Sequence, residues 1–567
     1  MYSNKENVNI LTALLAAYGV RHAVVCPGSR NAPIVHNLNE CPDIECHPVT
    51  DERSAGFCAI GMSLATGLKP VAVCVTSGSA VLNLAPAVAE AFYRHIPLIV
   101  ISADRPAQWI GQLDGQTLPQ PGAFGTMVRK CVTLPEPQND EERWMCNRLV
   151  CEALYLSTCR TGAPVHINVP ITEPLFTFDN ERLPDERIVT HCRRDSRTTS
   201  CDALPEAWFT ARRPMVVIGQ MPCGAIDSST LYTLSRSFVT LCEPLGSDAV
   251  HFDEVIRIKS SDENYMPDYI LYIGDTVVSK AARRFLRCSG APSCLLTADD
   301  SVITDPLMRL THIARYDSPD VLKRLPELLG AGNERSRESL STDNAADIAA
   351  ERTCFLQLWN NALDAASRHA EDYEPEYSSM AAVKYFEQQL ADMEYDWHVH
   401  YANSSAIRLA NIFATHHVEC NRGVNGIEGS LSTAAGHSMA TADMVFCVIG
   451  DLSFFYDQNA LWNTSLKGNL RIILLNNGGG SIFRGLPGLS GSAAADSLVA
   501  ACHTTKAEGI CTQNDIGYMA AHDMDEMQLG IVTLLTRQAE RPMLLEVMTD
   551  STKDNDVMAD YFKSFRP

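Results

Sequence analysis

Short apolar runs alternate along the chain with stretches whose apolar residues recur at helical spacing. Positions 8–18 have that spacing, and Gly19 follows them as a predicted C-cap. Further helical spacing at 81–93 predicts another helix. Short β-branched runs predict strands at 20–26, 70–76 and 97–102. Strands that alternate with helices predict a parallel sheet covered by helices on both faces.

The same alternation returns twice further along the chain. The predicted strands are 214–219, 269–274 and 293–297, then 396–401, 444–449, 470–475 and 542–547. A proline-bearing segment at 169–184 separates the first unit from the second, and the polar stretch 330–353 has linker composition. We therefore predict an α/β protein with three doubly wound parallel-sheet domains. Their expected bounds are 1–182, 183–345, ending in the polar linker, and 346–567.

Composition and charge exclude several functional classes. The 567 residues include 46 Lys and Arg against 68 Asp and Glu, giving a net charge of −22. This acidity argues against a nucleic-acid binder and against docking on anionic membranes. The N-terminus lacks the features of a signal peptide, and no apolar run is long enough for membrane insertion. The 20 cysteines are scattered without CxxC spacing, so we expect reduced thiols, a cytoplasmic protein and no zinc site.

The strongest local signal follows two predicted strands of the third unit. The strand 444–449 runs into Gly450-Asp451, and the strand 470–475 runs into Asn476-Asn477 and three glycines. Neighbouring parallel strands would place Asp451 and Asn477 side by side, where their oxygens suit Mg²⁺ and nearby N–H groups suit phosphates. The alternative is two ordinary turns, in which Asp, Asn and Gly are common.

This pair of turns resembles the cofactor motif of thiamine-diphosphate enzymes. The resemblance implies that Asp451, Asn477 and the carbonyl of Gly479 hold Mg²⁺ or Mn²⁺ on the cofactor's diphosphate. Leu452, which replaces the motif's usual third glycine, and Ser453 would also contact the cofactor.

The resemblance also implies a glutamate that faces the aminopyrimidine ring and shares a proton with a ring nitrogen. Glu52, in the segment TDERSAGF, is the candidate for this catalytic, cofactor-binding role. For a lone glutamate at that place, the alternative is stabilisation of a helix N-terminus by its charge.

Several longer segments resemble the synthases of menaquinone biosynthesis within the thiamine-diphosphate enzymes. The segments are CPGSRNAP, TDERSAGF, TSGSAVLNL, SADRP, GQTLPQPGAFG, CNRGVNGIEGSLSTAAG and GDLSFFYDQNAL. The resemblance implies a carboligase, a transferase that decarboxylates 2-oxoglutarate and adds the succinyl carbanion to isochorismate. It also implies a homodimer or homotetramer with the active site between subunits.

Two dianionic substrates require fixed positive charge, and the guanidinium fork suits carboxylates. By resemblance, the substrate pocket comprises Ser29, Arg30, Arg105, Gln116, Ser404, Arg408 and Arg422. We expect Ser404 and Arg408 to meet the part derived from 2-oxoglutarate. For any single arginine, an ordinary ion pair is the alternative. No basic residue lies in the middle-domain stretch 299–306, so Lys280 or Arg283 could replace the one that the family can place there.

Three apolar residues complete the predicted cofactor site. Ile427 would lie beneath the cofactor and force its bent shape, and Ile482 and Phe483 would wall the cofactor and substrate. A place in the protein core is the alternative for Ile427 and for Phe483.

Two other functions remain open from the sequence. Another thiamine-diphosphate decarboxylase or carboligase, of the acetolactate synthase type, would use Glu52 and Asp451 with a smaller 2-oxo acid such as pyruvate. A non-catalytic phosphate-binding protein would bind ligands without releasing carbon dioxide, but it leaves the combination of Glu52, Asp451 and Asn477 unexplained.

Overall fold

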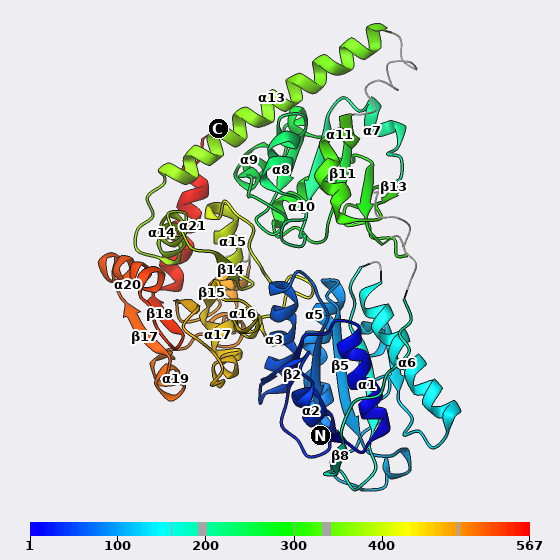
Figure 1. The fold of residues 1–567 in the computed structure, drawn as a ribbon. Helices are drawn as coiled ribbons and strands as arrows, with labels where there is room; N and C mark the ends of the chain where they lie inside the picture. Colours follow the sequence, from blue (N-terminus) through cyan, green and yellow to red (C-terminus); the bar gives the residue numbers. More distant parts are fainter. Residues whose placement is uncertain (160, 191–200, 300, 331–341, 485–487, 567) are drawn as a thin grey trace.

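Three parallel β-sheets follow one another along the chain in the computed structural model (Figure 1). The structure describes residues 1–567 except 160, 191–200, 300, 331–341, 485–487 and 567. All strand pairs within the three sheets are parallel, and helices cover both faces, so the predicted fold class is confirmed. No helix in the described part of the chain has both the length and the apolar character needed to span a bilayer.

The first sheet has six strands and a core on each face. Its order is β3 (Glu45–Pro48), β2 (His22–Val25), β4 (Val71–Val75), β5 (Leu98–Asp104), β7 (Val165–Pro170) and β6 (Lys130–Thr133). Its helices are α1 (Glu6–Ala17), α2 (Ala32–Glu40), α3 (Glu52–Ala65), α4 (Ser79–Asn83), α5 (Ala85–Tyr93) and α6 (Asp140–Thr158). Alternate residues of one strand enter different cores: Ala72 packs with α1, α2 and α6, whereas Val73 packs with α3 and α5. A short antiparallel pair, β1 (Tyr2–Ser3) and β8 (Phe178–Asn180), joins the ends of this region.

The middle sheet has five strands. Its order is β10 (Val239–Cys242), β9 (Pro214–Ile218), β11 (Tyr269–Ile273), β12 (Ser293–Thr297) and β13 (Leu310–Arg315). Its helices are α7 (Glu206–Thr210), α8 (Ser228–Ser235), α9 (Phe252–Lys259), α10 (Lys280–Cys288) and α11 (Leu325–Gly330). The long helix α13 (Thr342–Asp372) runs along this sheet (Figure 1) and buries Phe355 and Trp359 in the core beneath α9 and α10.

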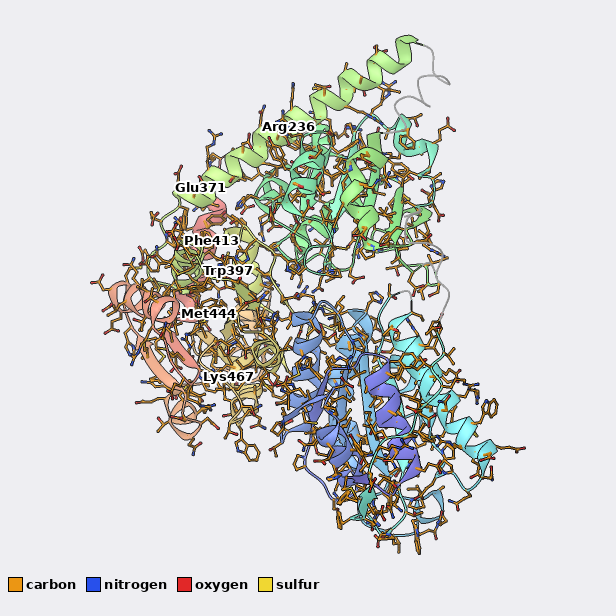
Figure 2. The ribbon with its side chains drawn as sticks, in the orientation of Figure 1. Arg236, Glu371, Trp397, Phe413, Met444 and Lys467 are labelled. Atoms are coloured by element: carbon orange, nitrogen blue, oxygen red, sulfur yellow. The ribbon has the colours of Figure 1, made fainter. Side chains whose placement is uncertain are left out.

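The third sheet also has five strands, and its core is continuous with one core of the first sheet. Its order is β14 (Trp397–Tyr401), β15 (Met444–Gly450), β16 (Leu470–Asn476), β18 (Met543–Met548) and β17 (Gly517–Ala521). Its helices are α14 (Ser379–Leu390), α15 (Ser405–Phe413), α16 (Ser430–Ala440), α17 (Asp451–Tyr456), α18 (Ser481–Arg484), α19 (Glu508–Gln513), α20 (Met524–Thr536) and α21 (Ser551–Ser564). Trp397 and Met444, labelled in Figure 2, begin the pairing of β14 with β15.

Two local predictions need correction. The pattern at 81–93 predicted one helix, but α4 ends at Asn83 and α5 starts at Ala85, with Pro86 in its first turn, where a proline is tolerated. The predicted linker 330–353 falls partly on undescribed residues, and from 342 onward it is the first part of α13. Residues 346–353 of this helix are mostly exposed, so their polar side chains belong to a solvated helix face. The domain division at 182 and 345 stays a proposal, because α13 starts near the second boundary and packs on the middle sheet.

Helix α3 of the first unit packs against helix α16 of the third unit, and glycine residues allow the two helices to lie very close together. A Cβ at Gly61 would lie 1.9 Å from the Thr433 carbonyl oxygen, and one at Gly436 would lie 2.0 Å from the Cys58 oxygen. Both neighbours are backbone atoms, which cannot rotate away. The two helices therefore meet backbone to backbone.

We predict that Gly61→Ala destabilises the protein, because the added methyl group forces these helices apart. Overpacking of this kind costs about 1–3 kcal/mol or more, which lowers the thermal midpoint by several degrees. Differential scanning calorimetry measures the shift. Gly509→Ala is the matched control: it lies in α19 with open space around the new methyl group, so its midpoint should stay or rise. An unchanged midpoint in Gly61→Ala would contradict the backbone contact.

Candidate functional site

Asp451 lies where β15 ends, beside the end of β16. The two strands pair in parallel with Gly450 opposite Leu475, so the turns that follow them are neighbours. The Asp451 carboxylate accepts the N–H of Leu452 at 2.6 Å and that of Gly479 at 2.9 Å, and thus connects both turns. Burial raises the pKa of Asp451, and the two N–H groups and nearby His503 oppose that rise. A divalent cation would stabilise the ionised carboxylate further.

The turn after β16 combines an amide side chain with glycines. The Asn477 amide nitrogen donates to Asp554 at 2.8 Å. Gly478 and Gly479 have φ values of 78° and 151°, and a Cβ at Gly479 would lie 2.9 Å from the Ala500 oxygen, so only glycine fits this turn. A carboxylate, a carboxamide and peptide carbonyls are the hard oxygen donors that Mg²⁺ and Mn²⁺ prefer, so the donor set fits the predicted metal.

A cavity of about 310 Å³ opens over these turns. Every residue that the sequence predicted for the site in the third unit lines it: Ser404, Arg408, Arg422, Ile427, Asp451, Leu452, Ser453, Asn477, Gly479, Ile482 and Phe483. Ile427 is 37% exposed, and Phe483 is only partly buried, so neither is an ordinary core residue.

Two arginines, neither of which forms an ion pair in the described part of the chain, bring positive charge into this cavity. Burial, then Arg422 and Arg257, lowers the pKa of the Arg408 guanidinium. Arg422 donates from Nη1 to the Asn403 side chain at 3.1 Å, and its Nε is buried with no hydrogen-bond acceptor in the described part of the chain. An unpaired buried donor is costly, and a bound carboxylate would satisfy it. The cavity is therefore built for an anion.

The backbone at the end of β14 is strained. Ser404 has φ 80°, a value that costs a non-glycine residue about 1–3 kcal/mol. The strain turns the chain from β14 into α15, which carries Arg408 into the same cavity. Such strain is typical of functional sites.

Sequence reasoning missed three residues that shape the site: Asn403, Glu90 and His503. Asn403 donates to the carbonyls of Asn421 and Gly426 and so holds the Arg422 loop closed. His503 Nε2 lies 3.4 Å from the Asp451 carboxylate. No local pattern marks these positions, because their partners lie far away in the sequence.

Glu90 holds the other side of the Arg422 loop. Only 2% exposed, its carboxylate accepts the N–H groups of Gly423 and Val424, each at 2.8 Å. Beside it, Arg94 forms a buried ion pair with Glu419 at 2.8 Å. Helix α5 of the first sheet thus positions the loop that presents Arg422.

The first-unit candidates gather at the carboxyl edge of the first sheet. Ser29 and Arg30 follow β2, Arg105 follows β5, and Gln116 packs against Gly78 in the turn after β4. Arg30 is buried and bonds the Ile171 carbonyl at 3.1 Å, whereas Ser29 and Gln116 are exposed.

Arg105 and Glu52 make the remaining contacts at this edge. Arg105 bonds the Gly115 carbonyl at 3.1 Å and pairs with Asp114 at 2.9 Å. Glu52 is the first residue of α3 and accepts from Asn83 at 3.1 Å. None of the five first-unit candidates lines the cavity of the third unit, whose lining runs from Ser379 to Phe483. A single chain thus presents two separate halves of the predicted site.

A second cavity, of about 610 Å³, adjoins the first between the middle and third sheets. Arg408 lines both cavities, and the second also contains Lys280 and Arg257. Of the two middle-domain candidates, Lys280 therefore lies next to the site, and Arg283 does not line either cavity.

Comparison with known proteins defines first the class and then the family. Residues 6–123 match the family model described as "Thiamine pyrophosphate enzyme, N-terminal TPP binding domain". The N-terminal region therefore contains a thiamine pyrophosphate binding domain, which agrees with the class that the motifs indicated.

Full-length relatives narrow the class. The chain is 40% identical over 582 residues to a protein of Bacteroides thetaiotaomicron, covering 100% of both chains. It is 41% identical over 583 residues to a protein of Bacteroides fragilis, and the match covers 100% of both chains. It is 32% identical over 582 residues to a protein of Porphyromonas gingivalis, and that match covers 99% of this chain and 97% of the relative. All three are named 2-succinyl-5-enolpyruvyl-6-hydroxy-3-cyclohexene-1-carboxylate synthase. This chain belongs to that synthase family, which confirms the resemblance seen in the motifs.

We predict that Glu90→Gln loosens the Arg422 loop, because a neutral amide has one acceptor oxygen in place of a charged carboxylate. The bonds lost are worth about 1.5–3 kcal/mol, so amide exchange at Gly423 and Val424 should speed up about tenfold or more. Hydrogen–deuterium exchange with mass spectrometry measures this peptide. Glu141→Gln, on an exposed turn of α6, is the control and should leave it unchanged. Equal exchange in both variants would mean that Glu90 does not hold the loop.

Proposed function

We propose that this chain is a thiamine-diphosphate-dependent carboligase that decarboxylates 2-oxoglutarate and joins the remaining succinyl unit to isochorismate. The product would be 2-succinyl-5-enolpyruvyl-6-hydroxy-3-cyclohexene-1-carboxylate, formed together with carbon dioxide in menaquinone biosynthesis. The observation that carries this proposal is the cavity that combines the oxygen atoms of Asp451 and Asn477 with Arg408 and Arg422. Neither arginine forms an ion pair in the described part of the chain. Full-length identity to synthases of that name supports it.

The third unit would hold the cofactor and its metal. Asp451, Asn477 and the Gly479 carbonyl would bind Mg²⁺ or Mn²⁺, while Leu452 and Ser453 at the start of α17 would face the diphosphate. When bound, thiamine diphosphate supplies the electron sink for decarboxylation and carbon–carbon bond formation. Its apolar contacts would be Ile427, Ile482 and Phe483.

The protein's own groups would orient substrates and move one proton. Ser404 and Arg408 would hold the 2-oxoglutarate-derived carboxylate, and the free Nε of Arg422 would bind another. From the first sheet, Ser29, Arg30, Arg105 and Gln116 would complete the substrate pocket. Glu52 would share its proton with a ring nitrogen of the cofactor.

The two halves of the site would come from different subunits. The third-unit cavity lacks every first-unit candidate, yet the reaction needs Glu52 beside the cofactor. A homodimer, or a homotetramer built from such dimers, would bring the first sheet of one chain to the third sheet of its partner. We place the protein in the cytoplasm, since the described cysteines are free thiols, as a reducing compartment maintains them.

The alternative of an acetolactate-type enzyme would use the same cofactor residues with pyruvate. Arg408 and Arg422 argue against it, because pyruvate has a single carboxylate and would leave one guanidinium unpaired in the cavity.

We predict that the purified protein releases carbon dioxide from 2-oxoglutarate only with thiamine diphosphate and Mg²⁺. With isochorismate present, mass spectrometry should identify the succinyl–cyclohexene product, and pyruvate should give no release. Turnover of pyruvate without isochorismate would favour the acetolactate type. Cofactor binding without any turnover would favour the non-catalytic alternative.

We predict that two inactive variants restore activity when they are combined in one oligomer. Glu52→Gln removes the proton-sharing carboxylate, and Asp451→Asn removes the metal's charged ligand, so each alone should lose most turnover. If each site takes Glu52 from one subunit and Asp451 from the other, a mixed dimer keeps one intact site, and random pairing of co-expressed chains should regain about a quarter of wild-type activity. No recovery in a verified mixed oligomer would place the whole site within one chain.

A further inference from the structure

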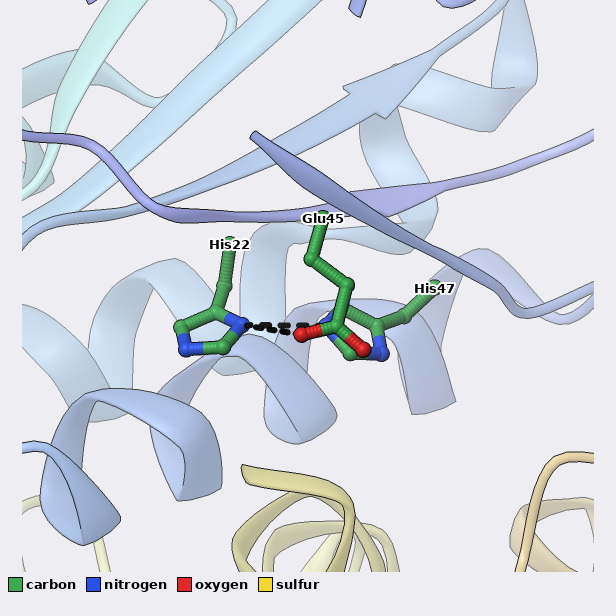
Figure 3. Close-up of side chains that lie close together, drawn as sticks. All are labelled: His22, Glu45 and His47. Carbon is green, nitrogen blue, oxygen red and sulfur yellow. Dashed lines mark hydrogen bonds and ion pairs between the residues drawn. The ribbon is translucent and has the colours of Figure 1, made fainter. Parts of the chain in front are cut away.

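Three metal-ligating side chains meet on the first sheet, outside the cavities described above. His22 begins β2, and Glu45 and His47 lie two positions apart on β3, which is an edge strand. The parallel register places His22 opposite Glu45. Because residues i and i+2 of a strand share a face, all three side chains project to the same side, and Figure 3 shows the two rings and the carboxylate converging.

The distances between the ligand atoms suit one small ion. His22 Nδ1 lies 3.1 Å from His47 Nε2, and Glu45 Oε2 lies 3.7 Å and 4.0 Å from these two nitrogens. A tetrahedral ion with bonds near 2.0–2.1 Å separates its ligand atoms by about 3.3–3.4 Å. The two nitrogens are within about 0.3 Å of this spacing, and Glu45, whose side chain is 67% exposed, can move the roughly 0.3–0.7 Å that separate its oxygen from it. In the described part of the chain, these residues form the one such group of three or more His, Cys, Asp or Glu.

Both imidazoles are kept neutral, which metal binding requires. Burial, with smaller contributions from His22 and from Lys467, labelled in Figure 2, lowers the pKa of His47 to about 4, although Glu45 acts in the opposite direction. Burial and Lys69 likewise lower the pKa of His22. Without a metal, one ring N–H bridges the two facing nitrogens; when an ion binds, that proton moves to the other nitrogen of its ring. The positive lysines oppose a cation, and the Glu45 carboxylate offsets them.

We infer that His22, Glu45 and His47 form a binding site for a divalent transition-metal ion, Zn²⁺ foremost. Two imidazoles and one carboxylate are the ligand set of three-ligand zinc sites, in which water takes the fourth position. Imidazole nitrogen favours Zn²⁺ over Mg²⁺, whereas the oxygen cluster around Asp451 has the opposite preference. The two sites therefore differ in the ion that they take.

The ion would fasten an edge strand that leads to the predicted catalytic glutamate. Among the strands that the structure describes, β3 pairs only with β2, and Glu52 begins α3 five positions after His47. A bond from the ion to each strand would hold β3 in register and limit movement of the 48–51 turn. Because the ion binds the folded state, it would also stabilise that state by mass action.

The test is Zn²⁺ titration of untagged, chelator-treated full-length protein against a chromophoric chelator, in excess Mg²⁺. We expect one equivalent bound per chain. Removing one ligand by His22→Ala or His47→Ala should weaken binding about 100-fold, and Glu45→Gln about tenfold. His522→Ala removes an exposed histidine elsewhere and should bind like the wild type.

Co²⁺ as a spectroscopic probe identifies the ligands independently. Tetrahedral d–d bands without sulfur-to-metal charge transfer support the histidine site, whereas strong charge transfer would assign the ion to cysteines and overturn the inference. So would a wild type that binds no Zn²⁺, or binding unaffected by the three substitutions. If His47→Ala does not fold, Glu45→Gln, at an exposed side chain, and His22→Gln decide the outcome.

Discussion

The packing of α3 on α16 is the constraint on which the arrangement of the site depends. Along this contact Gly61, Gly429 and Gly436 each face another residue's atoms so closely that a side chain would collide. α3 begins with Glu52, and α16 follows directly on the loop of Arg422 and Ile427. The contact therefore fixes the distance between Glu52 and the cavity of the third unit within one chain. In the proposed dimer, Glu52 of each chain would then lie at the cavity of the other chain.

Buried charge is the second element of this arrangement. Glu90 and the Arg94–Glu419 ion pair lie where α5 meets the loop of the third unit, and Glu90 accepts the backbone N–H groups of Gly423 and Val424, which would otherwise lack acceptors. Arg408 and Arg422 are the opposite case: burial, then Arg422, lowers the pKa of Arg408, and neither arginine forms an ion pair in the described part of the chain. The charged groups that support the Arg422 loop thus have partners within the chain, whereas the arginines of the cavity are available to an anion.

The sequence predicted the elements whose information is local. Strand runs such as 293–297, the two turns at Asp451 and Asn477, and the three-sheet architecture all follow from short patterns and were found in the structure. Motif resemblance pointed to Arg408, Arg422 and Ile427, and the structure brings Arg408, from α15, into one cavity with Arg422 and Ile427, from the loop before α16.

The residues that the sequence did not reveal make contacts with residues far away in the chain. Glu90 acts on residues more than three hundred positions away, and only the fold of α5 against the Arg422 loop reveals it. The helical character of 342–353 was hidden because an exposed helix and a linker have similar composition.

The cluster of His22, Glu45 and His47 likewise could not be found from the sequence alone. Glu45 and His47 are neighbours on one strand, but a lone pair of this kind has no specific meaning until the register of β2 against β3 adds His22. The expectation of no zinc site rested on cysteine spacing alone, and histidine and carboxylate ligands do not depend on that spacing. Because a parallel sheet places residues from separate strands at fixed lateral spacing, it can build a nitrogen-rich site at its edge and an oxygen-rich site at the ends of its strands. Ligand chemistry, not overall charge, would then direct the two proposed metals to different sites: every divalent ion is drawn equally to a net charge of −22, but only the donor atoms distinguish Zn²⁺ from Mg²⁺.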